Sequence, residues 1–254
     1  MAASHVSCYN VLGVGVSALT FAQARDLVLD ARRAEPRGYI CCGTAHGLVE
    51  AHRDPALRDA YNRSWLTTPD GMPLVWLGPP HVERVYGPDL MLAVCDAGRA
   101  HSLRHYFYGG HPGVADTLRE KLVARFPGLE VAGTFTPSFQ PFDANELAAR
   151  RADVARCAPD VIWVGLGTPK QELFMARHAP TLDAGVLIGV GAAFDFNSGR
   201  VRQAPPWIRG SGFEWLFRFA MSPRRLGWRY LKTNPLFLAH LFAQKTGLKK
   251  YRID

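Results

Sequence analysis

The sequence predicts an α/β protein built on a doubly wound, mostly parallel sheet with a C-terminal amphipathic helical appendage. Apolar runs of strand length alternate with segments of helix length, and most runs end in a turn rich in glycine or proline. This alternation is typical of a parallel sheet covered by helices on both faces. Hydrophobic residues make up 48% of the 254 residues and charged residues 20%, so the chain can build a large core.

Each element is predicted from a short local pattern. The predicted strands are residues 10–16, 38–42, 65–68, 105–108, 129–134, 161–165 and 185–190. The predicted helices are residues 20–32, which Thr20 can cap, then 55–62, 89–100, 114–126 and 144–157, and one more that starts near residue 168. Ligands of such sheets bind beyond the carboxyl ends of the strands, and the unusual loops of this chain all lie there.

The last fifty residues differ from the rest. Residues 205–254 hold ten Lys or Arg and two acidic residues, so they carry the whole net charge of +8. Aromatic and basic side chains are interleaved there, and Pro223 and Pro235 each follow a cap residue, which predicts two helix starts. We therefore predict two units: residues 1–204 form the sheet domain, and residues 205–254 form an appendage of three short amphipathic helices with a stop near Gly247. A basic tail on a neutral body indicates a polyanionic partner, either nucleic acid or anionic lipid.

Several classes of function find no support in the sequence. The run GVGVSA at residues 13–18 matches a dinucleotide-binding pattern, but the helix signal comes after it and no acid follows the second strand. No Asp-x-Asp occurs and the histidines lack metal-ligand spacing, so we expect no metal ion. We expect neither a signal peptide nor a transmembrane helix, because no suitable apolar run is present. The five cysteines form no Cys-x-x-Cys pair, which predicts buried thiols in a reducing compartment.

The stretch VGLGTPKQE is the most unusual of the loops. Thr168 as N-cap, Pro169 in the first turn and Gln171 two positions later fit a capping box, which is a purely structural explanation. The glycines at 165–167 would also let a ligand approach the backbone, and a helix N-terminus beside Lys170 favours an anion. The spacing is not that of a P-loop, so a bound diphosphate fits better than triphosphate hydrolysis.

Other strand ends carry candidate groups, each with a structural alternative. Asp70 lies in an Asp-Gly turn, or it is a carboxylate base that faces the cleft. Arg84 and Asp89 form a surface ion pair, or Arg84 binds phosphate. The glycine loop at 108–113 suits close backbone contact with a ligand, and Asp195 follows the last strand, where ordinary turn chemistry is the alternative.

Taken in order, these stretches resemble those of the WecG/TagA/CpsF glycosyltransferases of bacterial surface polysaccharide assembly. The matching stretches, spread over nearly the whole chain, are PDGMPLVW, ERVYGPDLM, YGGHPGVA, FPGLEVAG, VGLGTPKQE, GVGAAFDFNSGRVRQAPPWI and GFEWLFRF followed by SPRRLGWRYL. Two places depart from the family pattern. Thr44-Ala45-His46 stands where the family usually has Thr-x-Asn, and Pro137-Ser138-Phe139 stands where it usually has Gly-Tyr-Phe.

The resemblance implies a Rossmann-like fold and an inverting transferase that uses neither a metal ion nor another cofactor. The sugar, N-acetylmannosamine, its uronic acid or glucose, would pass from a UDP-sugar to a polyprenyl-diphosphate-linked saccharide. The enzyme would be cytoplasmic and peripherally bound to the anionic inner face of the bacterial cell membrane, with no nucleic-acid partner. A homo-oligomer stays an open alternative.

The resemblance also implies roles for single residues. Asp70 would be the general base, and Thr44 and Gln171 would position donor and acceptor. The implied substrate-binding residues are Arg84, Gly109, Gly110, Gly165, Gly167, Thr168, Pro169, Lys170, Asp195, Arg218, Arg225 and Arg229. The alternative is a non-catalytic α/β protein that uses its basic tail to bind a membrane or nucleic acid; such a protein would tolerate the loss of Asp70.

Overall fold

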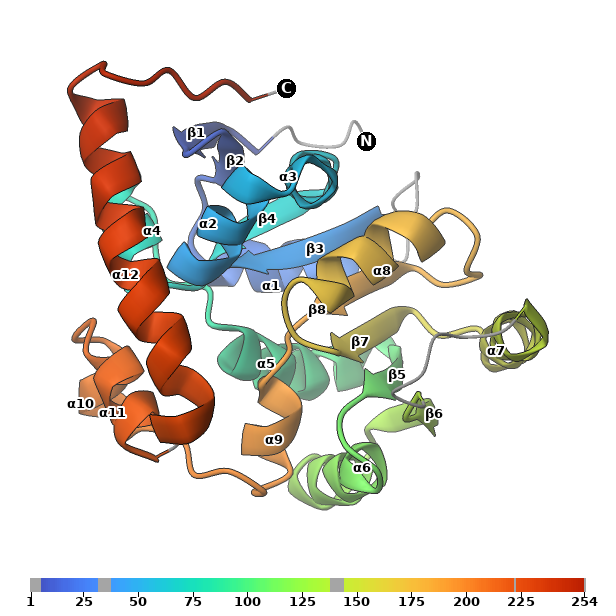
Figure 1. The fold of residues 1–254 in the computed structure, drawn as a ribbon. Coiled ribbons are helices and arrows are strands. Elements are labelled where there is room, and N and C mark those ends of the chain that lie inside the picture. Colours follow the sequence, from blue (N-terminus) through green and yellow to red (C-terminus); the bar gives the residue numbers. More distant parts are fainter. Residues whose placement is uncertain (1–5, 32–37, 138–143, 222, 254) are drawn as a thin grey trace.

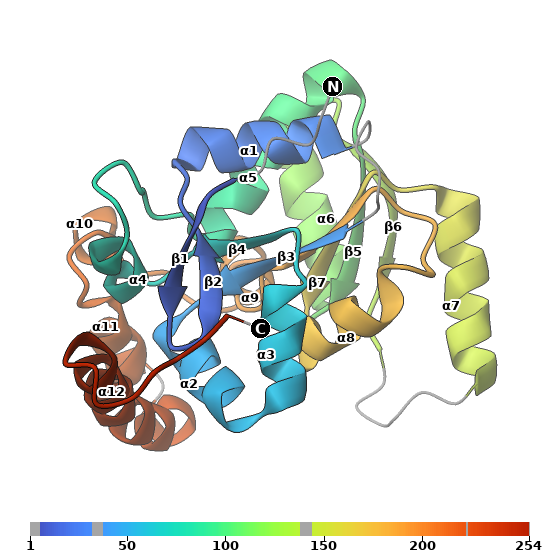
Figure 2. The same ribbon diagram turned by 90° about the horizontal axis from the view of Figure 1, so that it is seen from above.

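A six-stranded parallel sheet lies between two layers of helices in the computed structural model, which describes residues 6–31, 38–137, 144–221 and 223–253 (Figure 2). The strand order is β4-β3-β8-β7-β5-β6. The bounds are β3 Gly38–Gly43, β4 Leu66–Pro69, β5 Arg104–Gly109, β6 Glu130–Phe135, β7 Val161–Gly165 and β8 Val186–Gly189. Because all six strands run the same way, their carboxyl ends meet at one edge, as the sequence predicted.

Alternate side chains of each strand enter two separate hydrophobic cores. Ile40 and Trp163 belong to the core under α1, α5, α6 and α9, whereas Tyr39 and Ile162 belong to the core under α2, α3, α7 and α8. The bounds of these helices are α1 Phe21–Asp30, α2 Ala45–Arg53, α3 Pro55–Asn62, α5 Gly87–Gly98, α6 Val114–Arg125, α7 Ala144–Cys157, α8 Lys170–His178 and α9 Ala193–Asn197. Burial on both faces explains why the strands read as nearly continuous apolar runs.

Local signals account for several of the boundaries. Thr20 and Gln23 form a capping box at the start of α1, and the Asp54 side chain accepts hydrogen bonds from the first turn of α3. A short 3₁₀ turn, η2 (Arg99–His101), follows α5. Cys41, Cys42 and Cys95 are buried, as predicted for the cysteines, whereas Cys8 is exposed and Cys157 is partly exposed.

Residues 10–16 are not the single strand that the sequence predicted. They belong to an antiparallel hairpin of β1 (Cys8–Val11) and β2 (Val14–Ser17). Leu12 and Gly13, the two residues of its turn, both have positive φ, 55° and 86°. Such two-residue turns match the twist of paired strands. Polar contacts support the left-handed Leu12, because its N–H donates to the Gln244 side chain, which comes from the other end of the chain.

The C-terminal region begins with two short helices, α10 (Pro206–Arg209) and α11 (Glu214–Met221), and continues in the long α12 (Pro223–Lys245). The predicted helix start at Pro223 is confirmed, and Gly247, with φ 74°, follows the end of α12. The predicted start at Pro235 is wrong, because Pro235 lies inside α12. An interior proline removes one helical hydrogen bond. Buried side chains on both sides of it, Thr233 and Phe237, hold the two halves of the helix against the protein.

The long helix α12 packs along α2 at one side of the sheet (Figure 1). Phe237 and the tail residue Tyr251 are buried in the same core cluster as α2, α3 and the hairpin. The Asn10 side chain donates to the Tyr251 carbonyl, so the tail also bonds to β1. No helix among the described residues has both the length and the apolar character needed to cross a bilayer.

Candidate active site

The loops at the carboxyl edge of the sheet, α4 (Met72–Leu77) and the C-terminal helices enclose a cavity of about 1250 Å³. Most of the predicted site residues line it: Thr44, Asp70, Arg84, Gly110, Gly165, Gly167, Thr168, Lys170, Gln171, Asp195, Arg218 and Arg229. Gly109 and Pro169 are not among the lining residues. Arg225 lies in α12, but its side chain is outside the described residues.

Asp70 follows β4 directly and is held at the cavity wall by its neighbours. Its N–H donates to the Gly43 carbonyl, and its Oδ2 accepts a 2.9 Å hydrogen bond from the Gly87 N–H. Gly87 is the first residue of α5, so this N–H has no partner within the helix. Burial raises the pKa of the Asp70 carboxyl to about 6, while Arg84 and the Gly87 N–H oppose that rise.

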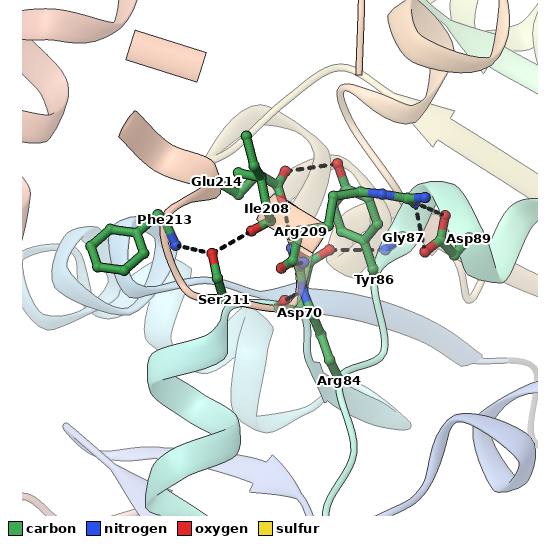
Figure 3. A network of polar contacts seen from close by, with 10 residues as sticks. All are labelled: Asp70, Arg84, Tyr86, Gly87, Asp89, Ile208, Arg209, Ser211, Phe213 and Glu214. Carbon is green, nitrogen blue, oxygen red and sulfur yellow. Dashed lines mark hydrogen bonds and ion pairs between the residues drawn. The ribbon is translucent and has the colours of Figure 1, made fainter. Parts of the chain in front are cut away.

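Arg84 ties Asp70 to the C-terminal region (Figure 3). Its Nε donates to the Asp70 carbonyl at 2.5 Å, and its Nη1 donates to the Arg209 carbonyl at 2.6 Å. Its Nη2 bonds to Glu214 Oε2 at 2.7 Å, whereas the distance from Nη2 to Asp70 Oδ1 is 3.8 Å. The guanidinium also lies 4.1 Å above the Tyr86 ring.

The ion pair that the sequence offered as an alternative, between Arg84 and Asp89, is wrong. Arg84 pairs with Glu214, and both Asp89 oxygens accept from Arg209, at 2.7 and 3.0 Å (Figure 3). Glu214 itself is buried and also accepts a 2.8 Å hydrogen bond from the Tyr86 hydroxyl. Sequence reasoning missed Glu214. The one feature of the sequence that could have pointed to Glu214 is that it is one of only two acidic residues in the basic segment 205–254.

The loop between β7 and α8 does not form the predicted capping box. The helix starts at Lys170, and its N-cap residue Pro169 makes no side-chain cap bond. The Gln171 side chain instead accepts from the Gly167 N–H at 3.1 Å and donates to Glu172 Oε1 at 3.0 Å. The hydroxyl of Thr168 donates to the same Glu172 oxygen. The loop is therefore shaped by Glu172, which is fully buried and has a pKa raised by its desolvation.

The glycines of the strand ends serve two different purposes. A Cβ at Gly165 would lie 2.6 Å from the Phe194 ring, and one at Gly109 would lie 2.7 Å from the Gly165 backbone. These two positions must stay small for packing. Gly167, with φ 74°, has no atom within 4 Å of an added Cβ and lines the cavity. Of these three glycines, Gly167 is the one whose backbone is open to a ligand.

Thr44 and His46 begin α2 at the cavity wall. The Thr44 hydroxyl accepts from the Gly47 N–H at 3.1 Å, which caps the helix. His46 lies 3.5 Å from the Thr233 hydroxyl of α12. Burial, reinforced by the nearby charge of Arg229, lowers the pKa of His46 to about 4, so its ring is neutral at physiological pH.

Three cations line the cavity without a carboxylate partner. Among the described residues, no acidic side chain forms an ion pair with Lys170, Arg218 or Arg229, and the buried Arg229 Nε has no hydrogen-bond acceptor. Asp195, by contrast, pairs with Arg200 at 2.9 Å. Positive charge in a partly closed cavity favours an anionic ligand.

The sequence matches the family described as "Glycosyl transferase WecG/TagA/CpsF family" over residues 9–251. The chain belongs to this family. It is 30% identical over 205 residues to the N-acetylglucosaminyldiphosphoundecaprenol N-acetyl-beta-D-mannosaminyltransferase of Bacillus spizizenii, across 79% of this chain and 77% of that protein. It is 26% identical over 205 residues to the protein of the same description from Bacillus subtilis strain 168, with the same shares of 79% and 77%.

Both departures of this glycosyltransferase from the family pattern reach the cavity. His46 lines it from the start of α2, and Pro137 lines it from the segment after β6. Ser138 and Phe139 lie outside the described residues. At the start of α2, the cavity of this WecG/TagA/CpsF member is therefore lined by His46 where the family usually has Asn.

Proposed function

We propose that this family member transfers an N-acetylmannosamine-type sugar from a UDP-sugar to a polyprenyl-diphosphate-linked N-acetylglucosamine, with inversion. One observation carries the proposal: a single cavity holds a carboxylate with a raised pKa, Asp70, and three cations, Lys170, Arg218 and Arg229, that pair with no acidic side chain among the described residues. A base and a set of anion-binding groups are what transfer from a nucleotide diphosphate requires. The names of the two Bacillus relatives supply the sugar and the acceptor.

In this proposal Asp70 Oδ1 accepts the proton of the acceptor hydroxyl. The freed oxygen attacks the anomeric carbon of the donor on the face opposite the diphosphate, and a new C–O bond forms. The bond between the anomeric carbon and the diphosphate oxygen breaks, and UDP leaves with that electron pair. Lys170, Arg218 and Arg229 meet the charge that develops on UDP, in a cavity where such contacts are stronger than in water.

The apolar part of the cavity suits the lipid of the acceptor. It is lined by Met72 and Trp76 of α4 and by Leu226, Phe237, Leu238 and Leu241 of α12. Trp76 and Leu238 are 64% exposed, so this wall opens to the surface. A polyprenyl chain could follow it outward while its diphosphate stays near the cations.

We propose that the same helices dock on the anionic inner face of the cell membrane. α10, α11 and α12 expose large apolar side chains, namely Trp207, Trp215, Leu216, Met221, Trp228, Leu231, Leu238 and Phe242. Basic residues lie among and after them, including Lys232, Lys245, Lys249 and Lys250. Apolar side chains can enter the headgroup region, and each nearby Lys or Arg adds about 1 kcal/mol at an anionic leaflet.

The test is a donor panel with the full chain. The UDP derivatives of N-acetylmannosamine, its uronic acid, N-acetylglucosamine and glucose are each incubated with a short-chain polyprenyl diphosphate that carries N-acetylglucosamine. Released UDP is measured, and the mass of the lipid product is determined by mass spectrometry. We expect UDP release with UDP-N-acetylmannosamine and a product heavier by one N-acetylhexosamine. UDP release that does not depend on the acceptor, or no product with any donor, would overturn the proposal.

A further inference from the structure

Arg84 donates to three acceptors, and their arrangement keeps one oxygen of Asp70 free. The Gly87 N–H occupies Asp70 Oδ2, and among the described residues no group donates to Oδ1 within hydrogen-bond distance. The nearest cationic atom is Arg84 Nη2, at 3.8 Å, and that atom lies 2.7 Å from Glu214 Oε2. Glu214 therefore competes with Asp70 for one end of a single guanidinium.

Glu214 is itself held in place from several directions (Figure 3). Its Oε1 accepts from the Tyr86 hydroxyl at 2.8 Å, and it is the first residue of α11, where a helix favours a negative charge. The segment before it is fixed as well, since Arg209 bonds to both oxygens of Asp89 and gives its carbonyl to Arg84. Glu214 can thus fix where the Arg84 guanidinium lies.

We propose that Glu214 is a positioning residue that, once residues 206–221 are docked on the sheet domain, holds the Arg84 guanidinium away from Asp70 Oδ1 and so keeps that oxygen open as the proton acceptor. This inference rests on the proposed function, in which Asp70 is the base. It adds a residue of the C-terminal region that touches no reacting atom and acts through Arg84. In this proposal, docking of residues 206–221 brings Glu214 to Arg84 and thereby makes Asp70 competent as the base.

The charges around Asp70 support this role. The charges of Arg84, and of Glu214 and Arg218 of α11, all act on Asp70, and its own charge acts on the Cys42 thiol of β3 and on Tyr86. Arg84 and Arg218 lower the pKa of Asp70, whereas Glu214 raises it. If Glu214 loses its charge, Arg84 Nη2 is free to pair directly with Oδ1, which lowers the basicity of the carboxylate.

The experiment compares Glu214→Gln, Glu214→Asp and Tyr86→Phe with the wild-type full chain. The Gln variant keeps the size of the side chain but removes its charge, the Asp variant keeps the charge, and the Phe variant removes the hydroxyl that donates to Glu214. Two readouts are taken for each. One is the pH dependence of kcat/KM, and the other is the ¹³C NMR titration of the Asp70 carboxyl carbon without substrate, assigned with Asp70→Asn.

We expect Glu214→Gln to lower kcat/KM about tenfold and to move both the acid limb and the NMR titration to lower pH, by about half a unit or more. Glu214→Asp keeps the charge, so it should titrate close to the wild type and lose less rate than Glu214→Gln. Tyr86→Phe should lower the rate without moving the titration. Should Glu214→Gln fail to fold, an Asp70 titration that moves by about half a pH unit or more in Glu214→Asp or Tyr86→Phe would still overturn the proposal.

Two results would overturn the proposal. In the first, Glu214→Gln loses rate but titrates like the wild type, which would make Glu214 only a structural tie. In the second, Glu214→Asp or Tyr86→Phe moves the titration as far as Glu214→Gln does, which would separate the effect from the charge of Glu214. The NMR titration needs no turnover, so it stands even when no donor is accepted and the proposed function itself has failed.

Discussion

The N–H of Gly87 donates to Asp70 Oδ2 at 2.9 Å, so the first residue of α5 fixes one oxygen of the buried carboxylate. The other oxygen, Oδ1, lies 3.8 Å from Arg84 Nη2, and Asp70 lines the cavity. A carboxylate held by one oxygen keeps a fixed direction while the other can receive a proton. If Asp70 is the base, Oδ2 therefore anchors the carboxylate and Oδ1 takes the proton, which the following substitutions test.

Asp70→Asn should abolish transfer but spare donor binding. Asn keeps the size of the side chain and can still accept from Gly87 through its carbonyl oxygen, but it cannot take up a proton. We expect a loss of about 10²–10⁴-fold in kcat, with UDP affinity changed less than about threefold. Steady-state UDP release measures kcat, and calorimetry measures the UDP affinity. Asp59→Asn, an exposed aspartate of α3, serves as the control. Turnover of Asp70→Asn within threefold of wild type would remove Asp70 from the mechanism.

The same substitution should stabilise the protein, and only at higher pH. The pKa of Asp70 is raised from 3.8 to about 6 in the folded state, because burial disfavours the charged form. The stability that the protonated group contributes is complete below about pH 4 and is lost as the pH rises through about 6. Asp70→Asn escapes that loss, so we expect a gain on the order of 1–3 kcal/mol at pH 7.5 and none at pH 4. Urea unfolding at the two pH values measures the difference. An equal effect at both values would contradict the raised pKa.

Lys170→Ala should weaken UDP binding more than acceptor binding. Lys170 is the first residue of α8, lines the cavity and forms no ion pair with any described acidic residue, so a diphosphate would meet both its charge and the helix N-terminus. We expect UDP affinity to fall about tenfold. Arg177→Ala, in the last turn of the same helix, removes an equal charge away from the cavity and should leave UDP affinity unchanged. Unchanged calorimetric affinity in Lys170→Ala would leave the loop with only a structural role.

Transfer should continue in excess EDTA. In the proposed reaction, Lys170, Arg218 and Arg229 neutralise the departing UDP, which is the task that a divalent ion performs in many nucleotide-sugar enzymes. We expect the same initial rate of UDP release with and without the chelator. Activity that disappears with EDTA and returns with added Mg²⁺ or Mn²⁺ would show that the three side chains do not suffice.

The sheet was readable from the sequence because its signals are local. The predicted bounds of α3, α7 and β7 agree with the structure; α3 has the Asp54 cap and Pro55 at its start, and β7 is an uninterrupted apolar run between turn residues. The edge that carries the candidate site followed from the same reasoning, because parallel strands place all their carboxyl ends together. Asp70, which directly follows β4, and Lys170, at the end of the loop after β7, were therefore found as candidates, whereas Thr44 was implied by the family resemblance.

What the sequence could not supply are contacts between distant segments. Arg84 and Glu214 are 130 positions apart, and no local pattern distinguishes this pair from Arg84 with Asp89. The same limit explains the errors at Leu12 and Pro235. A leucine with positive φ and a proline inside a helix both contradict local preference. In each case packing of the C-terminal region, through Gln244 on the hairpin and Phe237 under α12, outweighs that preference.

Two phenylalanines of α12 separate the structural role of the C-terminal region from membrane docking. Phe237 is 3% exposed in the core beside α2, whereas Phe242 is 62% exposed. We expect Phe237→Ala to cost about 3 kcal/mol of unfolding free energy, and Phe242→Ala to cost less than about 0.5 kcal/mol. Phe242→Ala should instead reduce sedimentation with anionic liposomes, because it removes an apolar side chain from the surface that we propose enters the headgroup region.

The pair also tests the division into residues 1–204 and 205–254. If the appendage folded apart from the sheet domain, Phe237→Ala would leave the unfolding of the sheet domain unchanged. The burial of Phe237 and Tyr251 in the same cluster as Leu48 and Val11 argues instead that the whole chain unfolds as one unit. A single unfolding transition of Phe237→Ala, shifted equally in tryptophan fluorescence and in circular dichroism, would confirm that the whole chain unfolds cooperatively. Two separate transitions would instead support the predicted boundary at residue 204.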